Sequence, residues 1–162
     1  MFFWYVGVST AFVWNVFRSP SLDYRLVMAG SVLPLVEVVA GGPHLLHTLL
    51  FTVVLLVAVM LATRGRRLLR RRLISLPIGL LCGLVLDGAW TSTAVFWWPF
   101  LSGAGFPGGG LAELHRGPLV SLVLEAIGVA ALAWCWVAFG WSDAGNRRLF
   151  VRSGHLNREL LR

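Results

Sequence analysis

Residues 34–50 read PLVEVVAGGPHLLHTLL, and residues 83–91, GLVLDGAWT, follow after a long apolar run and a block of arginines. These two stretches contain four ionisable side chains, Glu37, His44, His47 and Asp87, in a chain that is 57% hydrophobic. An ionisable group inside a membrane segment is costly unless it is paired, hydrated or bound to a ligand. The four side chains are therefore the first candidates for a functional site.

The composition predicts an integral membrane protein. The mean hydropathy is +0.78, and only 13% of the residues are charged. Several apolar runs approach the roughly 20 residues that cross a hydrocarbon core about 30 Å thick. The net charge of +7 comes from arginine alone, and six arginines lie within residues 64–72. Such clusters are typical of cytoplasmic loops next to an anionic leaflet, so the expected partners are membrane lipids and not nucleic acid.

The hydrophobic pattern predicts an all-α, polytopic membrane helix bundle of about five segments. A short aromatic run at residues 94–101, AVFWWPFL, is too short to cross and is expected to be interfacial or re-entrant. Residues 1–145 form the predicted transmembrane bundle, and residues 146–162 form a basic cytoplasmic tail. The predicted membrane segments are residues 2–17, 26–40, 44–62, 73–91 and 118–141.

The arginines also predict an orientation. Arginine-rich loops remain on the cytoplasmic side, which places residues 64–72 and the C-terminal tail inside. Counting the segments backwards then places the N-terminus outside and the C-terminus inside. In this topology the four candidate side chains lie towards the extracytoplasmic side.

The spacing of the candidates allows two interpretations. His44 and His47 are three residues apart, so on a helix their rings project from one face. Imidazole and carboxylate groups are ligands for zinc and related divalent ions, and Glu37 and Asp87 on neighbouring helices complete such a set. The alternative is that the two histidines are polar residues at the end of an apolar segment.

Three acids lie on stripes of small residues at helical spacing. Small residues four apart let helices approach closely in lipid. Such packing turns the acids into the bundle, where they need partners. The stripes are Gly30, Pro34, Glu37 and Gly41; Gly79, Gly83 and Asp87; and Ser121, Glu125 and Gly128.

The order of these short patterns over residues 26–100 resembles a family of small bacterial inner-membrane proteins classed as membrane-bound metal-dependent hydrolases. That family carries Pro-Asp-x-Asp, Thr-His-Ser, His-x-x-x-Asp and Pro-Phe in sequence. Leu35 and Gly83 stand where the family has an acid and a histidine, and an N-terminal Thr-His is missing. The stretches that correspond are Pro34-Leu35-Val36-Glu37, His47-Thr48, Gly83 to Asp87 and Pro99-Phe100.

The resemblance implies a hydrolase of a lipid-linked ester or phosphate at the extracytoplasmic side of a bacterial inner membrane. It implies a divalent metal ion such as zinc, which activates water and polarises the scissile group. His44 is expected as a fourth ligand or general base, with His115 or Glu125 as proton donor. Arg116 is expected to bind a substrate phosphate. The implied metal ligands are Glu37, His44, His47 and Asp87.

Two other functions remain open from the sequence. The first is a non-catalytic membrane subunit or scaffold that packs against a larger envelope complex through its small-residue stripes and aromatic residues. The second is a small carrier or proton-coupled channel that uses Glu37, Asp87 and Glu125. The position of these acids towards one leaflet argues against the second, because a relay needs groups across the whole membrane.

Overall fold

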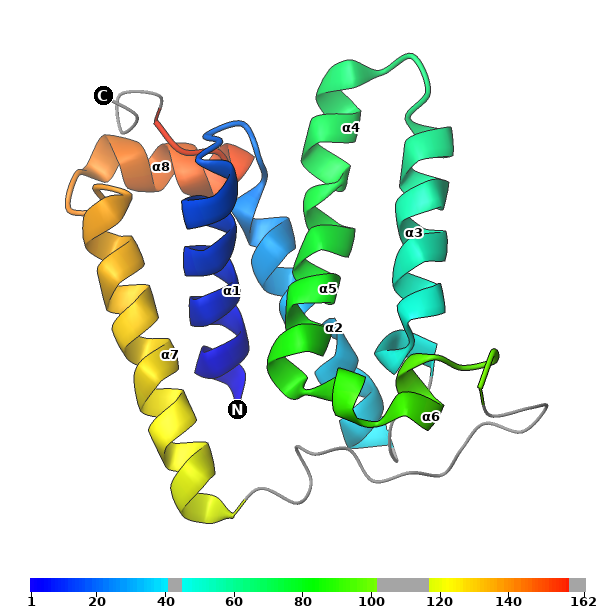
Figure 1. The fold of residues 1–162 in the computed structure, drawn as a ribbon. Coiled ribbons are helices and arrows are strands. Elements are labelled where there is room, and N and C mark those ends of the chain that lie inside the picture. The colour runs from blue at the N-terminus through cyan, green and yellow to red at the C-terminus, as the bar shows by residue number, and fades with distance from the viewer. Residues whose placement is uncertain (41–44, 102–116, 158–162) are drawn as a thin grey trace.

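The computed structural model describes residues 1–40, 45–101 and 117–157, and these parts of the chain are helical without a strand. The all-α prediction is thus confirmed. Figure 1 shows the long helices running up and down beside one another. In chain order the elements are α1 (Phe2–Phe17), α2 (Tyr24–Ala40), the 3-10 turn η1 (Leu45–His47), α3 (Leu49–Ala62), α4 (Arg67–Leu73), α5 (Ser75–Asp87), the 3-10 turn η2 (Ala89–Thr91), α6 (Thr93–Phe96), α7 (Pro118–Ala138) and α8 (Ala144–Ser153).

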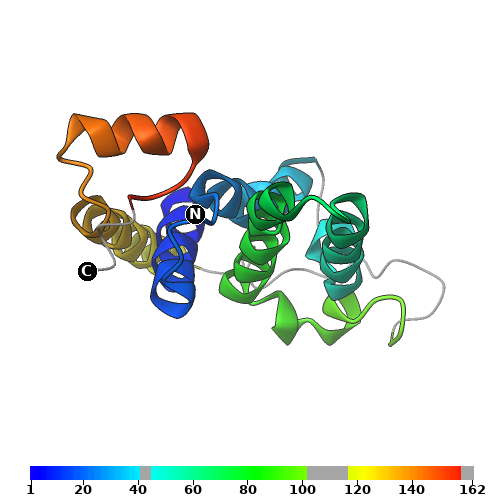
Figure 2. The same ribbon diagram turned by 90° about the horizontal axis from the view of Figure 1, so that it is seen from above.

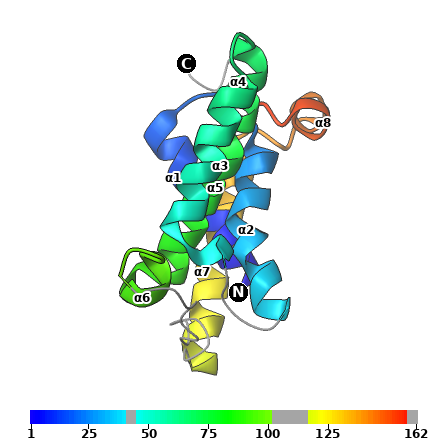
Figure 3. The same cartoon turned by 90° about the vertical axis from the view of Figure 1, so that its right-hand side faces the viewer.

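The long helices stand in a row. Helix α7 packs on α1, α1 packs on α2, α2 packs on α5, and α3 packs on the other side of α5. Seen from above, α7 and α3 occupy the two edges of this row (Figure 2). We use "end" for the ends of the helix axes and "edge" for the outermost helices of the row. Helix α8 lies across one end, whereas the short α6 lies at the opposite end (Figure 3). The middle of the row, where α2 meets α5, is therefore its best-covered part.

The helix ends differ from the predicted segments in several places, and residues 67–73 of the expected basic loop form helix α4. Thr48 is extended, and its hydroxyl accepts a hydrogen bond from Phe51 N–H, so α3 begins at Leu49 and not at residue 44. His47 therefore lies in η1, before α3. Helix α5 ends at Asp87 because Gly88 adopts a left-handed backbone with φ 77°. Helices α4 and α5 are separated only by Ile74, whose backbone is also helical.

Small residues hold the helices in close contact. A Cβ added to Gly79 would meet the backbone of Val27, and one added to Gly83 would meet the backbone of Ser31. A Cβ on Gly128 would meet the backbone of α1. These contacts confirm the predicted close packing at the stripes on α5 and α7, because no larger side chain fits between the backbones.

Among the described residues, α7 is the helix long and apolar enough to cross a membrane. It has 21 residues, and its most apolar window of 18 residues has a mean hydropathy of 2.0 and is only 11% buried in the protein. Helices α1 and α3 are also apolar but shorter. An exposed apolar helix supports association with a membrane, while about five crossings and their orientation remain predictions.

The row has two chemically different ends. We call the end with the α1–α2 loop, α4, α8 and residues 154–157 the arginine end, and the end with η1, α6 and the last residues of α2 and α5 the histidine end (Figure 1). At the arginine end, Trp14, Tyr24 and Phe139 pack ring against ring at centroid distances of 5.4 to 6.1 Å. At the histidine end, a smaller core contains Leu84 and Phe96.

Candidate functional site

The ring of His47 lies between two carboxylates at the histidine end. Its Nδ1 atom is 2.9 Å from Oε2 of Glu37, and its Nε2 atom is 3.9 Å from Oδ2 of Asp87. His47 is 1% exposed and Asp87 is 2% exposed. Helix α2, turn η1 and helix α5 thus bring three of the four predicted metal ligands together, although they are as many as 50 residues apart in sequence, from 37 to 87.

The hydrogen bonds around Glu37 set the tautomer of His47. Oε1 of Glu37 accepts a hydrogen bond of 2.9 Å from Leu46 N–H, and Oε2 faces Nδ1 of the ring. An ionised carboxylate has no proton to give, so Nδ1 carries the proton and donates it to Glu37. In the neutral ring, the lone pair of Nε2 then faces Asp87.

We call Glu37, His47 and Asp87 the cluster. Tyr5, on α1, contacts it from a fourth element. Its hydroxyl donates a hydrogen bond of 3.0 Å to Oδ1 of Asp87. The neighbouring Trp4 donates from its indole N–H to the carbonyl of Leu86, which fixes α1 against the end of α5. The sequence analysis missed Tyr5. The available signal was a phenol near the start of an otherwise apolar helix, because a buried Tyr hydroxyl usually finds a polar partner.

The local backbone explains why His47 points back into the bundle. After the 3-10 turn, Thr48 is extended and caps α3 with its side chain, so the chain changes direction between His47 and Leu49. Asp87 is the last residue of α5, directly before the left-handed Gly88. Both side chains therefore come from the ends of helices, where α2 passes close to each of them.

The described part of the chain provides two converging donor atoms for an ion. Nε2 of His47 and Oδ2 of Asp87 face each other, while both oxygens of Glu37 already accept hydrogen bonds. The residues with assigned positions contain no group of three or more His, Cys, Asp or Glu side chains that could hold one metal ion. A structural or catalytic zinc ion takes at least three protein ligands. The described donors alone are thus an incomplete set.

The remaining predicted site residues divide into two groups. Glu125, on α7, contacts the start of α1: its Oε2 accepts a hydrogen bond of 3.1 Å from Trp4 N–H, and its Oε1 lies 3.5 Å from the amino group of Met1. A carboxylate at this place complements the positive end of the helix dipole of α1. His44, His115 and Arg116 lie outside the described residues.

A cavity of about 180 Å³ lies at the histidine end. It is lined by Leu49 and by aromatic residues that include Phe96 and Trp97. None of the three side chains Glu37, His47 and Asp87 lines this cavity.

A second buried acid, Asp23, lies at the arginine end. Its carboxylate accepts hydrogen bonds from Arg25 and, at 2.9 Å, from Nε of Arg72. Its backbone N–H donates to the hydroxyl of Ser75. Burial on its own would raise the pKa of Asp23, but the two arginines outweigh it and hold the pKa below its usual value. Asp23 therefore joins the α1–α2 loop to the α4–α5 junction as an ionised carboxylate at neutral pH.

Comparison of the chain with protein-family models, with curated proteins and with solved structures finds no match. The argument for function accordingly depends on the geometry of the cluster and on the chemistry of its residues.

Proposed function

We propose that this chain is a multi-pass membrane protein that acts as a metal-dependent hydrolase on a lipid-linked ester or phosphate. The observation that supports this most is the convergence of Glu37, His47 and Asp87 from three separate elements. Burying imidazole and carboxylate groups inside an apolar bundle costs free energy. In membrane proteins such groups therefore usually belong to a functional site.

The gap between His47 and Asp87 is suited to a cation. With Nδ1 protonated, Nε2 presents a lone pair towards the carboxylate of Asp87 at 3.9 Å. Two acceptor atoms repel each other across such a gap, and a positive charge between them removes the repulsion. Two ligands that each lie about 2.0–2.2 Å from one ion are separated by no more than about 4.4 Å, so the observed spacing is compatible with a shared divalent ion.

In this proposal the other residues orient the ligands. Glu37 accepts the Nδ1 proton of His47 and so fixes the ring, as carboxylates do for histidines that bind metals. Tyr5 donates to one oxygen of Asp87, and the other oxygen lies 3.9 Å from Nε2 of the ring. A divalent ion bound here would lower the pKa of a water molecule and polarise a phosphoryl or carbonyl oxygen. Because Glu37 orients the ring here, His44, which is predicted from the sequence as a fourth ligand, becomes the proposed third protein ligand.

The distribution of charge supports the proposed location. The described arginines of α4 and α8 lie at the end of the row opposite to the cluster (Figure 1). Arginine-rich segments remain on the cytoplasmic side of a membrane, so we place the cluster on the extracytoplasmic side and the C-terminus inside. A substrate carried by a lipid reaches such a site from within the bilayer.

Metal content is the decisive measurement. Elemental analysis of detergent-purified protein should find about one divalent ion per chain, and His47→Ala and Asp87→Asn should each lose it. The exposed Asp143→Asn serves as the matched control, because Asp143 caps α8 away from the cluster. Hydrolysis of a lipid-linked phosphate ester should follow the metal content. Unchanged metal in both cluster variants would exclude the ligand assignment.

A non-catalytic membrane subunit is the second candidate, and the burial of the cluster favours it. A proton on Nε2 of His47 turns the same three residues into a closed ion triad, which holds α2, η1 and α5 together without metal. Such a protein contains no stoichiometric ion, retains no hydrolytic activity and co-purifies with a partner from the envelope. The two candidates thus give opposite results in the same elemental analysis.

A further inference from the structure

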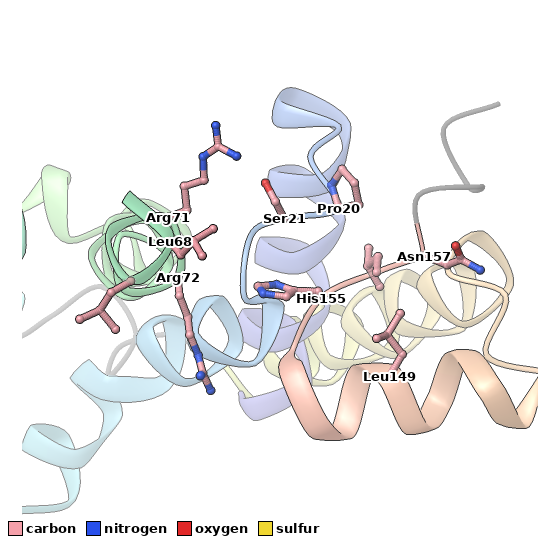
Figure 4. Close-up of a pocket in the computed structure, with 10 residues that line it drawn as sticks. Pro20, Ser21, Leu68, Arg71, Arg72, Leu149, His155 and Asn157 are labelled. Carbon is pink, nitrogen blue, oxygen red and sulfur yellow. The ribbon is translucent and has the colours of Figure 1, made fainter. Parts of the chain in front are cut away.

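A groove of about 680 Å³ opens at the arginine end, far from the cluster. One wall is α4, and the other is formed by the α1–α2 loop, α8 and the segment after it. Figure 4 shows His155 projecting across the groove towards Leu68, while Arg71 and Arg72 extend from α4 to either side. The groove therefore combines basic groups with apolar side chains from distant parts of the chain.

Long-range hydrogen bonds hold the two walls in place. Arg72 binds Asp23 through Nε, and Nδ1 of His155 lies 3.2 Å from the carbonyl oxygen of Leu22. Leu156 N–H donates a hydrogen bond of 3.1 Å to the carbonyl of Pro20. A carbonyl only accepts, so Nδ1 of His155 carries the proton. These bonds hold α4, the α1–α2 loop and the segment after α8 in place around the groove.

The charge in the groove is positive. Asp23 is shared between Arg25 and Arg72 and neutralises only one of them. Arg71 is exposed and makes no hydrogen bond or ion pair within the described residues. A guanidinium group presents a planar fork of donors that matches the oxygens of a phosphate. The groove therefore suits an anionic phosphate group.

The apolar part of the groove determines which phosphate compound fits. Leu68 is 84% exposed, and Leu149 contributes a second apolar side chain to the lining. A free phosphate ion gains nothing from these side chains, whereas a phospholipid buries its glycerol and upper acyl chain against them. Basic groups beside apolar surface at the cytoplasmic end of a helical bundle bind anionic lipid headgroups.

We propose that this groove binds the phosphate-bearing headgroup of one anionic phospholipid, with Arg71 as its principal contact. The proposal relies on the membrane location proposed above but not on the hydrolase activity. It assigns a role to α4 and to the C-terminal segment, which the cluster at the histidine end does not use.

The test is native mass spectrometry of the full chain in detergent, titrated separately with phosphatidylglycerol, phosphatidylcholine and inorganic phosphate. One molecule of phosphatidylglycerol should be retained at concentrations at which phosphatidylcholine and inorganic phosphate are not. Arg71→Gln should weaken the retention about fivefold, the loss expected for one basic contact near a lipid surface. Leu149→Trp should also weaken it, because the larger ring fills the groove without changing its charge.

Arg148→Gln is the matched control, since Arg148 is an exposed arginine on α8 that does not line the groove. Equal losses from Arg71→Gln and Arg148→Gln would overturn the proposal, because they would indicate attraction by net charge alone. Equal retention of both lipids, or retention of inorganic phosphate in place of lipid, would also overturn it. The metal content of the cluster is measured on the same samples, so failure of the groove and failure of the proposed hydrolase remain distinguishable.

Discussion

Asp23 and Asp87 lie at opposite ends of the helical row, and both are almost completely buried. The carboxylate of Asp23 is bound by two guanidinium groups, those of Arg25 and Arg72. The carboxylate of Asp87 is bound by the phenol of Tyr5 and faces an imidazole at 3.9 Å. One acid thus has permanent cations as partners, and the other has groups that can lose, gain or share a proton.

The difference separates a structural acid from a candidate reactive one. Guanidinium groups remain charged at every ordinary pH, so Asp23 stays ionised and its network serves to join loops and helices. Imidazole and phenol are the groups that proteins use for proton transfer and for orienting metal ligands. Burial alone therefore does not identify a functional acid; the chemistry of its partners does.

Replacing each aspartate by asparagine tests this comparison directly. Asp23→Asn weakens three charge-assisted hydrogen bonds from Arg25 and Arg72 and should lower the free energy of unfolding by about 3 kcal/mol. Asp87→Asn should cost about 1 kcal/mol, because the amide oxygen still accepts from Tyr5. Thermal unfolding of the detergent-solubilised variants measures both. Equal losses would show that the two acids have the same role.

Gly83→Ala should have the next largest effect and act on the histidine end. The added Cβ would meet the backbone of Ser31, which forces α2 and α5 apart one turn before Asp87. Overpacking of this kind costs about 2 kcal/mol, and it should also separate Asp87 from Glu37 and His47. Gly117→Ala is the control, since a Cβ there meets no atom of the described residues within 4 Å. Unfolding and metal content are measured together, and a stable, metal-loaded Gly83→Ala would refute the close crossing.

Lowering the pH should reduce the unfolding free energy through protonation of Asp23 at the arginine end. Arg25 and Arg72 hold the pKa of this carboxyl below its ordinary value of 3.8, so its contribution to stability is complete only well above pH 3.8. The contribution should decline as the pH falls below that value, by up to about 1.4 kcal/mol per pH unit for one bound proton. The difference in unfolding free energy between the natural chain and Asp23→Asn, measured from pH 6 to pH 3, isolates it. A difference independent of pH would contradict the assigned ion pair.

The sequence predicted the helices better than it predicted their contacts. The segments 2–17, 26–40 and 118–141 correspond closely to α1, α2 and α7, because long apolar runs and breaks at Gly and Pro determine where helices begin and end. The small residues of the stripes also predicted where the backbones meet. No such stripe was predicted on α1, however, and an apolar helix without an amphipathic pattern gives no other sign of its rotation.

Because the rotation of α1 about its axis was not predicted, some site residues were found from the sequence and others were not. Glu37, His47 and Asp87 were candidates because charged and imidazole groups are rare in apolar segments. Tyr5 was not, since a phenol is common there and only the orientation of α1 brings it to Asp87. The pairing of Arg72 with Asp23 was not predicted either. The two residues are 49 positions apart, and nothing in the sequence distinguishes Arg72 from the other arginines of residues 64–72.

The two tyrosines of the chain provide the finest test of the comparison between the ends. Tyr5 donates to the carboxylate of Asp87, and Tyr24 donates to the backbone carbonyl of Ser19 at the arginine end. Each Tyr→Phe substitution removes one hydrogen bond and should cost about 1 kcal/mol of unfolding free energy. Only Tyr5→Phe should also weaken metal binding, by about tenfold, because outer partners of metal ligands have effects of that size. Calorimetric titration of metal into the stripped variants measures this difference. If both variants bind metal as the natural chain does, Tyr5 has the same structural role as Tyr24, and Asp87 loses its main distinction from Asp23.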